Sequence, residues 1–283
     1  MGSAEPVLND HLQDQVAHES EIDEYYYGYR TIIENDENGD CQFKYRPLTF
    51  DDLLEPEEGD VYMEGSLHDE DIYRLKSIFR YHLRNRDDLT IYSDLKIIWG
   101  IDDLKNPAPD ISVLKDVKDP KKPRGEFHVQ EEETRPFFIL EVVSPRYRKA
   151  DVDKKPEIYR RAGVKEYVIV DPGLKNNEIS YKVSGYRLIG SRYIKIPQDE
   201  QGRIRIMTLN VFIGPVQSGA DLVVYDAGTG EEILPLEERA EQANQRAEQA
   251  SLRAEHERKR ADAFEQELIR LKEKMRNLES ASD

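Results

Sequence analysis

The sequence predicts an α/β (α+β) fold, in which a mixed central sheet is flanked by helices and followed by one long C-terminal helix. Short apolar runs, such as 136–143 and 166–170, alternate with amphipathic stretches, and such runs are typical of strands buried in a sheet. The last segment, 236–278, instead repeats alanine or apolar residues at alternating spacings of four and three. That spacing indicates a coiled-coil helix.

The composition bounds the organisation of the chain. It has 283 residues, of which 38% are hydrophobic and 35% are charged. This is enough for one sizeable core, and the excess of charge is typical of long solvated helices and disordered tails. We therefore predict a disordered acidic lead-in over 1–24, a folded domain over 25–230 and a coiled-coil helix over 233–280.

The sequence also indicates the environment of the protein. No stretch approaches the run of about 20 apolar residues that spans a bilayer, and no signal-peptide pattern is present at the start. Cys41 is the only cysteine, so an internal disulfide is excluded and a thiolate zinc site is disfavoured. We expect a cytoplasmic protein with no membrane partner.

The first half of the folded domain begins with strand signals. Aromatic and β-branched residues over 25–45 flank an Asn-Gly pair at 38–39, which predicts a β-hairpin. Apolar residues at spacings of three and four predict an amphipathic helix over 66–86, with Ser66 as its N-cap. The run 89–99 then reads as a strand.

The second half contains the most apolar segments. A strand is expected at 111–114, a charged loop at 118–133, and a central strand at 136–143 that is buried on both faces. A helix over 153–162 and a second buried strand over 166–170 follow. Gly163 is expected to end the helix, and Asp171-Pro172-Gly173 to end the strand. Several short β-rich segments are expected over 178–226. A strand, a helix and a strand in this order predict two parallel neighbours in one sheet.

One acid stands inside the most apolar strand. Glu141 would be costly to bury there unless it were paired or bound to a metal. Asp110 begins the strand-like segment 31 positions earlier. Two carboxylates at adjacent strand ends can hold a hard divalent cation, which lowers the pKa of bound water and stabilises charge on a phosphoryl group. The alternatives are a turn aspartate at Asp110 and an acid paired with Arg or Lys at Glu141.

Several motifs around these acids resemble the bacterial restriction endonuclease family called Uma-two, whose fold is PD-(D/E)XK. The resemblance covers roughly residues 48–280. It is carried by Asp110-Ile-Ser-Val-Leu, Glu141-Val-Val-Ser, Asp151-Val-Asp-Lys-Lys155, Tyr159-Arg-Arg-Ala-Gly-Val-Lys-Glu-Tyr167 and the Asp171-Pro172 pair after the following strand.

The resemblance implies roles for individual residues. Asp110 and Glu141 would be ligands of Mg²⁺ or Mn²⁺. The superfamily's usual lysine lies two residues after the second acid, where this chain has Val143. In the resembling family the lysine comes from the following helix, which implies Lys155, with its neighbour Lys154 as the alternative.

The first predicted helix adds candidates for the same site. The superfamily often carries an acid there, and Glu70 is the nearest match, with Asp69 and Asp71 as alternatives. His68 matches a frequent family position. For Glu70 and His68, an ordinary structural role is the competing interpretation.

The charge distribution bears on the substrate. The net charge of −17 argues against a nucleic-acid partner, but the stretch 145–165 is locally basic beside the proposed site. The tentative nucleic-acid-binding residues are Arg146, Arg148, Lys149 and Arg160.

Together these observations predict a metal-dependent endonuclease that hydrolyses DNA phosphodiester bonds through Asp110, Glu141 and Lys155; RNA is not excluded. The alternative is an inactive nuclease-fold binding or scaffold protein whose coiled coil mediates assembly. Residues 236–278 predict a homodimer or a higher homo-oligomer, of parallel or antiparallel helices.

Overall fold

The computed structural model describes residues 23–36, 38–63, 65–175 and 178–279, and it divides into two units, Met1–Ile233 and Leu234–Asp283. All but the last two residues of the lead-in predicted over 1–24 lie outside the described residues.

The first unit is built on a six-stranded mixed sheet with the order β11-β10-β9-β8-β6-β4. Strands β8 and β9 are parallel, as the strand-helix-strand pattern predicts, and every other neighbouring pair in this sheet is antiparallel. The strands are β4 (Leu89–Tyr92), β6 (Ile111–Lys115), β8 (Pro136–Val142), β9 (Glu166–Lys175), β10 (Glu178–Ile189) and β11 (Arg192–Lys195).

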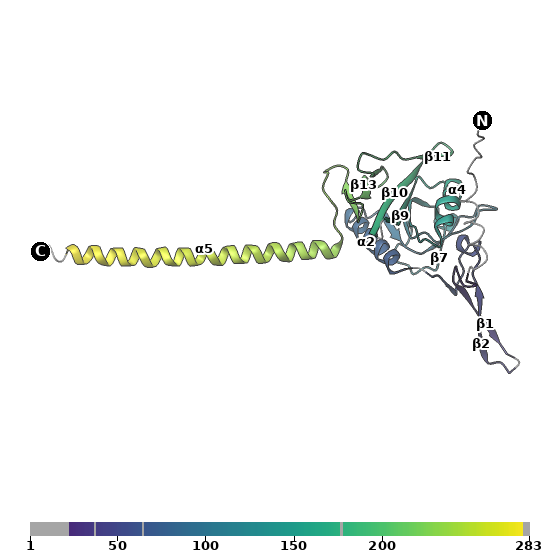
Figure 1. Cartoon of the computed structure of the whole chain (residues 1–283), viewed down its shortest axis with the longest axis horizontal. Coiled ribbons are helices and arrows are strands. Elements are labelled where there is room, and N and C mark those ends of the chain that lie inside the picture. The colour runs from purple at the N-terminus through teal and green to yellow at the C-terminus, as the bar shows by residue number, and fades with distance from the viewer. Residues whose placement is uncertain (1–22, 37, 64, 176–177, 280–283) are drawn as a thin grey trace, which may run out of the picture. The chain divides into compact units, whose positions relative to one another are not determined.

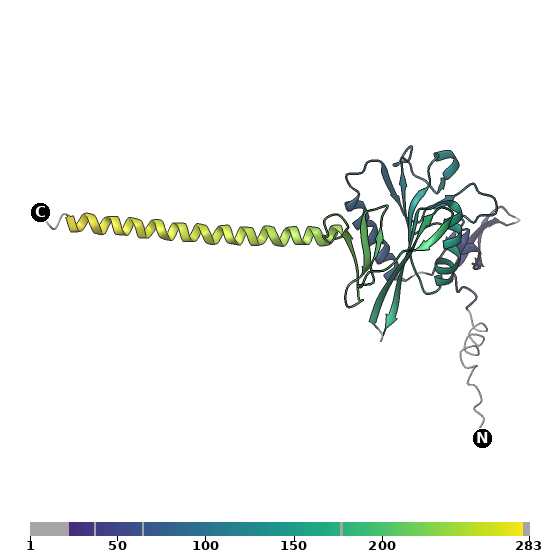
Figure 2. The same cartoon turned by 90° about the horizontal axis from the view of Figure 1, so that it is seen from above.

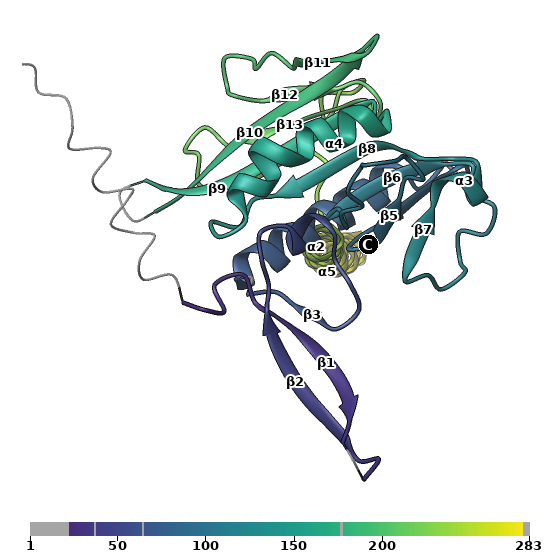
Figure 3. The ribbon, with the colours of Figure 1, turned by 90° about the vertical axis from the view of Figure 1, so that its right-hand side faces the viewer.

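Helices α2 (Ser66–His82) and α4 (Lys155–Ala162) cover opposite faces of this sheet (Figures 2 and 3). Alternate residues of β8 divide between two cores. Phe138 and Leu140 pack in the cluster that contains α2, whereas Ile139 packs in the cluster that contains α4. This division explains why β8 reads as a continuous apolar run, since it is buried on both sides.

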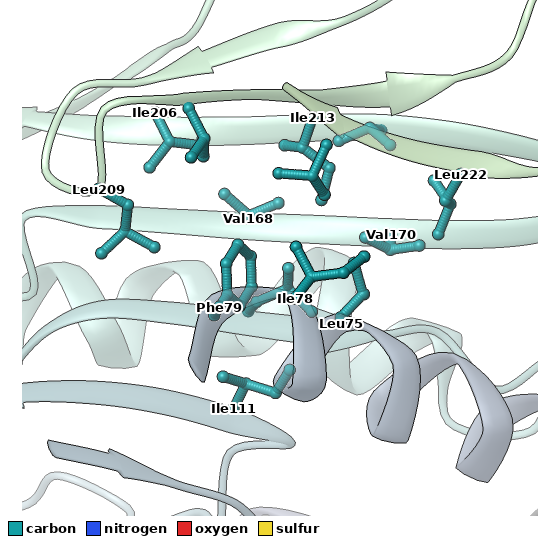
Figure 4. Close-up of a cluster of buried hydrophobic side chains, with 14 of the residues drawn as sticks. Leu75, Ile78, Phe79, Ile111, Val168, Val170, Ile206, Leu209, Ile213 and Leu222 are labelled. Atoms are coloured by element: carbon teal, nitrogen blue, oxygen red, sulfur yellow. The ribbon is translucent and has the colours of Figure 1, made fainter. Parts of the chain in front are cut away.

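A second, smaller sheet packs on the α2 face. Figure 4 shows Leu75 and Phe79 of α2 close to Val168 of β9, with Ile206 and Ile213 of the small sheet nearby. The sheet has the order β12-β13-β14, with β12 (Ile204–Ile206), β13 (Val211–Pro215) and β14 (Leu222–Asp226). The β-rich stretch predicted over 178–226 is thus divided between this sheet and strands β10 and β11 of the central sheet.

The predicted N-terminal hairpin is present, with β1 (Tyr29–Asn35) antiparallel to β2 (Cys41–Pro47) and to the short β3 (Asp60–Val61). It extends away from the central sheet (Figure 3). A 3₁₀ turn, η2 (Asp52–Leu54), follows β2 and buries its two leucines. The aromatic run from residue 25 precedes the hairpin and enters it only at Tyr29.

Three expectations about α2 and the next strand are wrong. The helix N-cap is Gly65 and Ser66 is the first helical residue, and the helix ends at His82 rather than 86. The run 89–99 is divided between β4 and β5 (Lys96–Ile98), which belong to different sheets. Asp94 adopts a left-handed backbone with φ 52°, which turns the chain between them.

Two loop expectations are also wrong. The stretch 118–133 contains β7 (Glu126–His128), which pairs in parallel with β5, and the short helix α3 (Val129–Glu132). Strand β9 continues through Asp171-Pro172-Gly173. Tyr181, which lies opposite Pro172, donates its backbone N–H to Gly219, so this pair needs no N–H from the proline.

The second unit contains one unbroken helix, α5 (Leu236–Glu279) (Figure 1). Large apolar seam residues are exposed in the single chain, among them Phe264, Leu268 and Leu271. Leu252 and Ile269 are also exposed but lie outside the predicted seam. Among the described residues, no helix is long and apolar enough to cross a membrane.

Candidate active site

The two predicted acids meet where β6 and β8 lie side by side. Asp110 immediately precedes β6, Glu141 lies in β8, and only 9% and 1% of these residues are exposed. The N–H of Asp110 donates to Oε2 of Glu141 at 3.3 Å, and the N–H of Val142 donates to Oδ2 of Asp110 at 2.6 Å. The backbone of each strand therefore holds the acid of its neighbour.

The predicted lysine joins this pair from the helix. The chain forms a π-helical turn, η3 (Ala150–Lys154), before α4, and Lys155 is buried whereas Lys154 is exposed. The ammonium group of Lys155 lies 2.9 Å from Oε1 of Glu141 and 2.7 Å from Oδ1 of Asp151. The geometry thus separates the two neighbouring lysines that the sequence left as alternatives.

Asp151 and Tyr159 belong to the cluster, although neither was assigned a role from the sequence. Asp151 is buried, and the Tyr159 hydroxyl donates to Oε1 of Glu141 at 2.5 Å. Their positions, four residues before and after Lys155, were the available signal, because residues at this spacing share one face of a helix.

The first helix contributes a histidine and none of the three predicted acids. His68 is buried, with Nε2 3.4 Å from Oδ2 of Asp110. Glu70 and Asp69 are exposed and lie outside the buried cluster. Asp71 is buried but accepts hydrogen bonds from the Tyr181 hydroxyl at 2.8 and 3.0 Å, on the β10 side of the helix.

Crowding of buried acids perturbs their protonation. Burial, reinforced by the charge of Glu141, raises the pKa of Asp110 to about 8. Burial also raises the pKa of Asp151 to about 6, although Lys155 opposes this shift. For Lys155 itself, burial alone would lower the pKa, but Asp151, Glu141 and Asp110 raise it above its ordinary value.

The cluster lines a cavity of about 660 Å³. Residues His68, Asp110, Asp151 and Lys155 lie in its wall, and the segment 53–62 lines it from the N-terminal side. Four exposed acids surround these groups: Glu57, Glu58, Asp94 and Glu126. Glu57 is paired with Arg30, and Glu126 lies 3.8 Å from Lys96, which also lines the cavity. The lining acids still outnumber the lining lysines, which favours a cation and disfavours a bare phosphate.

The tentative nucleic-acid-binding residues are only partly available. Arg148 forms an ion pair with Asp171, and Arg160 forms a two-fold ion pair with Glu157 at 2.6 and 2.8 Å. Arg146 and Lys149 instead lie over aromatic rings of the N-terminal segment. The local excess of positive charge in 145–165 is thus smaller at the surface than in the sequence.

Comparison with known proteins places this geometry in a family. The family model Uma2, described as "Putative restriction endonuclease", matches residues 54–211, which is more than half of the chain and includes the whole buried cluster. The chain belongs to the Uma2 family. Its mixed central sheet flanked by helices is accordingly the restriction-endonuclease-like fold, and the family supports a nuclease acting on nucleic acid.

One solved structure is similar at a low level. It is described as the crystal structure of a putative nuclease belonging to DUF820 from Anabaena variabilis ATCC 29413. The two share 15% identity with a TM-score of 0.36, over 62% of this chain and 82% of that one. A search of the curated proteins found no match.

The donor set of the Uma2 cluster fits a weakly held divalent cation. Among the described residues, no group of three His, Cys, Asp or Glu side chains is arranged to hold a metal ion. Mg²⁺, however, is commonly bound through one or two carboxylates, with water and substrate phosphate completing its shell. Asp110 and Glu141 supply such a pair, and Asp151 adds a third buried acid against a single buried lysine.

Proposed function

We propose that the chain is a metal-dependent endonuclease that hydrolyses phosphodiester bonds of DNA, with Asp110, Glu141 and Lys155 as its catalytic residues. The observation that carries this proposal is the contact between the Lys155 ammonium group and a buried acid pair inside the Uma2 region. Two acids can hold a divalent cation that activates water, and a lysine can stabilise the negative charge that develops on the phosphate.

Asp110 and Glu141 would hold the cation, Mg²⁺ or Mn²⁺. When bound, the ion would lower the pKa of a water molecule and offset negative charge on the phosphate. The cluster itself favours this role. It gathers three buried carboxyl groups around one buried ammonium group, so an added positive charge relieves their repulsion.

Lys155 would stabilise negative charge on the phosphate. Its raised pKa keeps it protonated at neutral pH, so it is unsuited to accept a proton from water. Asp151 and Tyr159 would act as positioning residues, because each contacts Lys155 or Glu141 through its side chain. His68, in contact with Asp110, is a further candidate in the same wall of the cavity.

The proposal covers the setting of the site as well. We place the protein in the cytoplasm, since its one cysteine, Cys41, is free and exposed. We also propose self-association through residues 236–278, because the apolar seam of α5 is exposed in the single chain.

The test is cleavage of supercoiled plasmid DNA by the full chain in Mg²⁺ or Mn²⁺. We expect nicked and then linear product, no product with a chelator, and no product from Glu141→Gln. A labelled single-stranded RNA in parallel separates DNA from RNA preference. A correctly folded wild-type chain that cleaves neither substrate in either metal would remove the proposal.

The acidic cavity favours one alternative. Four exposed acids surround the site, and they would repel an approaching phosphate backbone unless cations screened them. An inactive nuclease-fold scaffold, assembled through α5, would tolerate this charge. An oligomer in light scattering that neither cleaves the plasmid nor shifts labelled DNA or RNA in a gel would favour the scaffold.

A further inference from the structure

The seam of helix α5 assigns each of its residues a heptad position. Seam positions a and d are Leu236, Ala240, Ala243, Ala247, Ala250, Ala254, Glu257, Ala261, Phe264, Leu268 and Leu271 over the residues whose side chains the structure describes. The large members lie in the second half: Phe264, Leu268 and Leu271 are 68%, 53% and 50% exposed. Burial of these side chains supplies the driving force for pairing, and the alanine half adds little.

The residues that flank the seam determine which orientation the pair adopts. Between Arg239 and Lys274, the g positions are Arg239, Arg246, Arg253, Arg260, Glu267 and Lys274. Only Glu267 among them is acidic. In an antiparallel pair, g positions face g positions of the partner, so cations would meet cations at most levels. In the register that overlaps the whole seam, with Leu271 opposite Ala247, this repulsion disfavours antiparallel pairing.

In a parallel pair, a g residue instead faces the e residue five positions further along the partner. Arg260 then faces Glu265, and Glu267 faces Lys272, so both pairs are attractive. These pairs flank the same turns that carry Phe264, Leu268 and Leu271. The repulsive pair, Arg253 with Arg258, straddles Glu257 and lies outside the stretch 260–272.

We propose that α5 pairs with α5 of a second copy of this chain as a parallel two-stranded coiled coil, zipped through residues 260–272. The alanine half before Glu257 would be the looser part. This inference rests on the self-association proposed above and extends it to the orientation. A parallel pair attaches both nuclease units at the same end of the coil, so that two active sites are available to one duplex.

Cysteine cross-linking of the full chain tests the orientation in a Cys41→Ser background. Leu271→Cys occupies a d position, which faces its own copy in a parallel pair. It should form a covalent dimer when a mild oxidant is added. Gln266→Cys, at an exposed f position in the turn before, is the matched control and should remain monomeric on a non-reducing gel.

An antiparallel pair with overlapped seams would place Leu271 opposite Ala247. Cross-linking only in a mixture of Leu271→Cys and Ala247→Cys chains would therefore overturn the parallel assignment while keeping self-association. A monomer in light scattering would overturn both the parallel assignment and self-association. Equal cross-linking at positions 266 and 271 would indicate unspecific contact and would overturn the parallel assignment.

Charge reversal tests the flanking pairs without relying on a cross-link. Glu265→Lys sets a cation against Arg260 of the partner subunit and should weaken dimerisation by about tenfold. Adding Arg260→Glu to the same chain reverses the pair and should restore the affinity. A double variant that is weaker than the single variant would contradict the parallel pairing.

Discussion

The ammonium group of Lys155 lies 2.9 Å from Oε1 of Glu141, although the two residues come from a helix and from the central strand on which it packs. Val143, one residue past the end of β8, occupies the position where the superfamily usually has its lysine. Helix α4 thus supplies, through Lys155, the positive charge that the strand does not provide. Lys155 is held there by two acids, Glu141 and Asp151, which fixes its position and its protonation.

Replacing Lys155 should reduce the rate of cleavage far more than replacing Lys154. Lys155→Met removes a positioned charge, which by analogy with an oxyanion donor costs about 2.7–4 kcal/mol, or roughly 10²–10³ in kcat. Lys154→Met, at the exposed last residue of the preceding π-helical turn, is the matched control. Single-turnover rates and circular dichroism of both variants make the comparison. Full activity in Lys155→Met beside an inactive Lys154→Met would transfer the role to the neighbour.

Replacing Asp110 should change how the stability of the metal-free protein depends on pH. Its pKa is about 8 in the folded state, against about 3.9 for an ordinary aspartate, so folding favours the protonated form. The stabilisation is full below about pH 4 and is lost as pH rises towards 8. Asp110→Asn keeps an acceptor for the Val142 N–H and removes this loss.

Urea unfolding with a chelator present, at pH 5 and at pH 8.5, measures the effect. The wild type should lose more stability over this interval than Asp110→Asn. Parallel losses in the two proteins would show that Asp110 does not carry the raised pKa.

Binding of Mn²⁺ should tighten as pH rises. The cation needs the ionised form of Asp110, and below about pH 8 it must displace a proton from that carboxyl group. Affinity should increase by up to about tenfold per pH unit between pH 6 and pH 8 and then level off. Calorimetry of the wild type, with Glu141→Gln as a non-binding control, gives the profile. Equal affinity at pH 6 and pH 8 would place the ion elsewhere.

Two of the four basic residues near the site should matter more for DNA than the other two. Arg148 and Arg160 are already paired with Asp171 and Glu157, so their charges are largely offset. The double variant of Arg146 and Lys149 to alanine should weaken DNA binding and flatten its dependence on salt. The double variant of Arg148 and Arg160 to alanine serves as the control. The opposite order of effects would assign DNA contact to the paired arginines.

Removing α5 should remove self-association. A chain truncated after Pro235 lacks every seam residue, whereas the intact chain exposes Phe264, Leu268 and Leu271 unless they pair. Light scattering should give an oligomer for the intact chain and a monomer for the truncated chain. An intact chain that is monomeric at micromolar concentration would exclude the coiled coil and the two-strand arrangement that depends on it.

The central part of the fold could be predicted from the sequence because the local signals for strands and helix agree there. The apolar runs of β8 and β9 and the intervening helix specify a parallel pair, and the structure confirms it. The signal failed where tertiary contacts override local preference. Pro172 does not end β9, because its position in the ladder requires no N–H, and the segment around Phe127 becomes a strand because Ile97 of β5 pairs with it.

The candidate site, like the fold, could be predicted only in part from the sequence. Asp110 and Glu141 stood out as acids beside or inside buried strands, and their adjacency follows from strand order. Glu70 did not join them, since a helix position depends on rotation about the helix axis, which single acids do not reveal. Asp151 and Tyr159 share a helix face with Lys155, and only the packed structure shows that this face meets Glu141.

The most direct test of the proposed site is the initial rate of plasmid cleavage in Mn²⁺ by the wild type and by Asp110→Asn, each shown to be folded. Asp110→Asn keeps the shape and the backbone contact of the acid and removes the carboxylate that would bind the cation. We predict metal-dependent nicking by the wild type and loss of at least about two orders of magnitude in the variant. Undiminished cleavage by Asp110→Asn would contradict the assignment of this cluster as the active site.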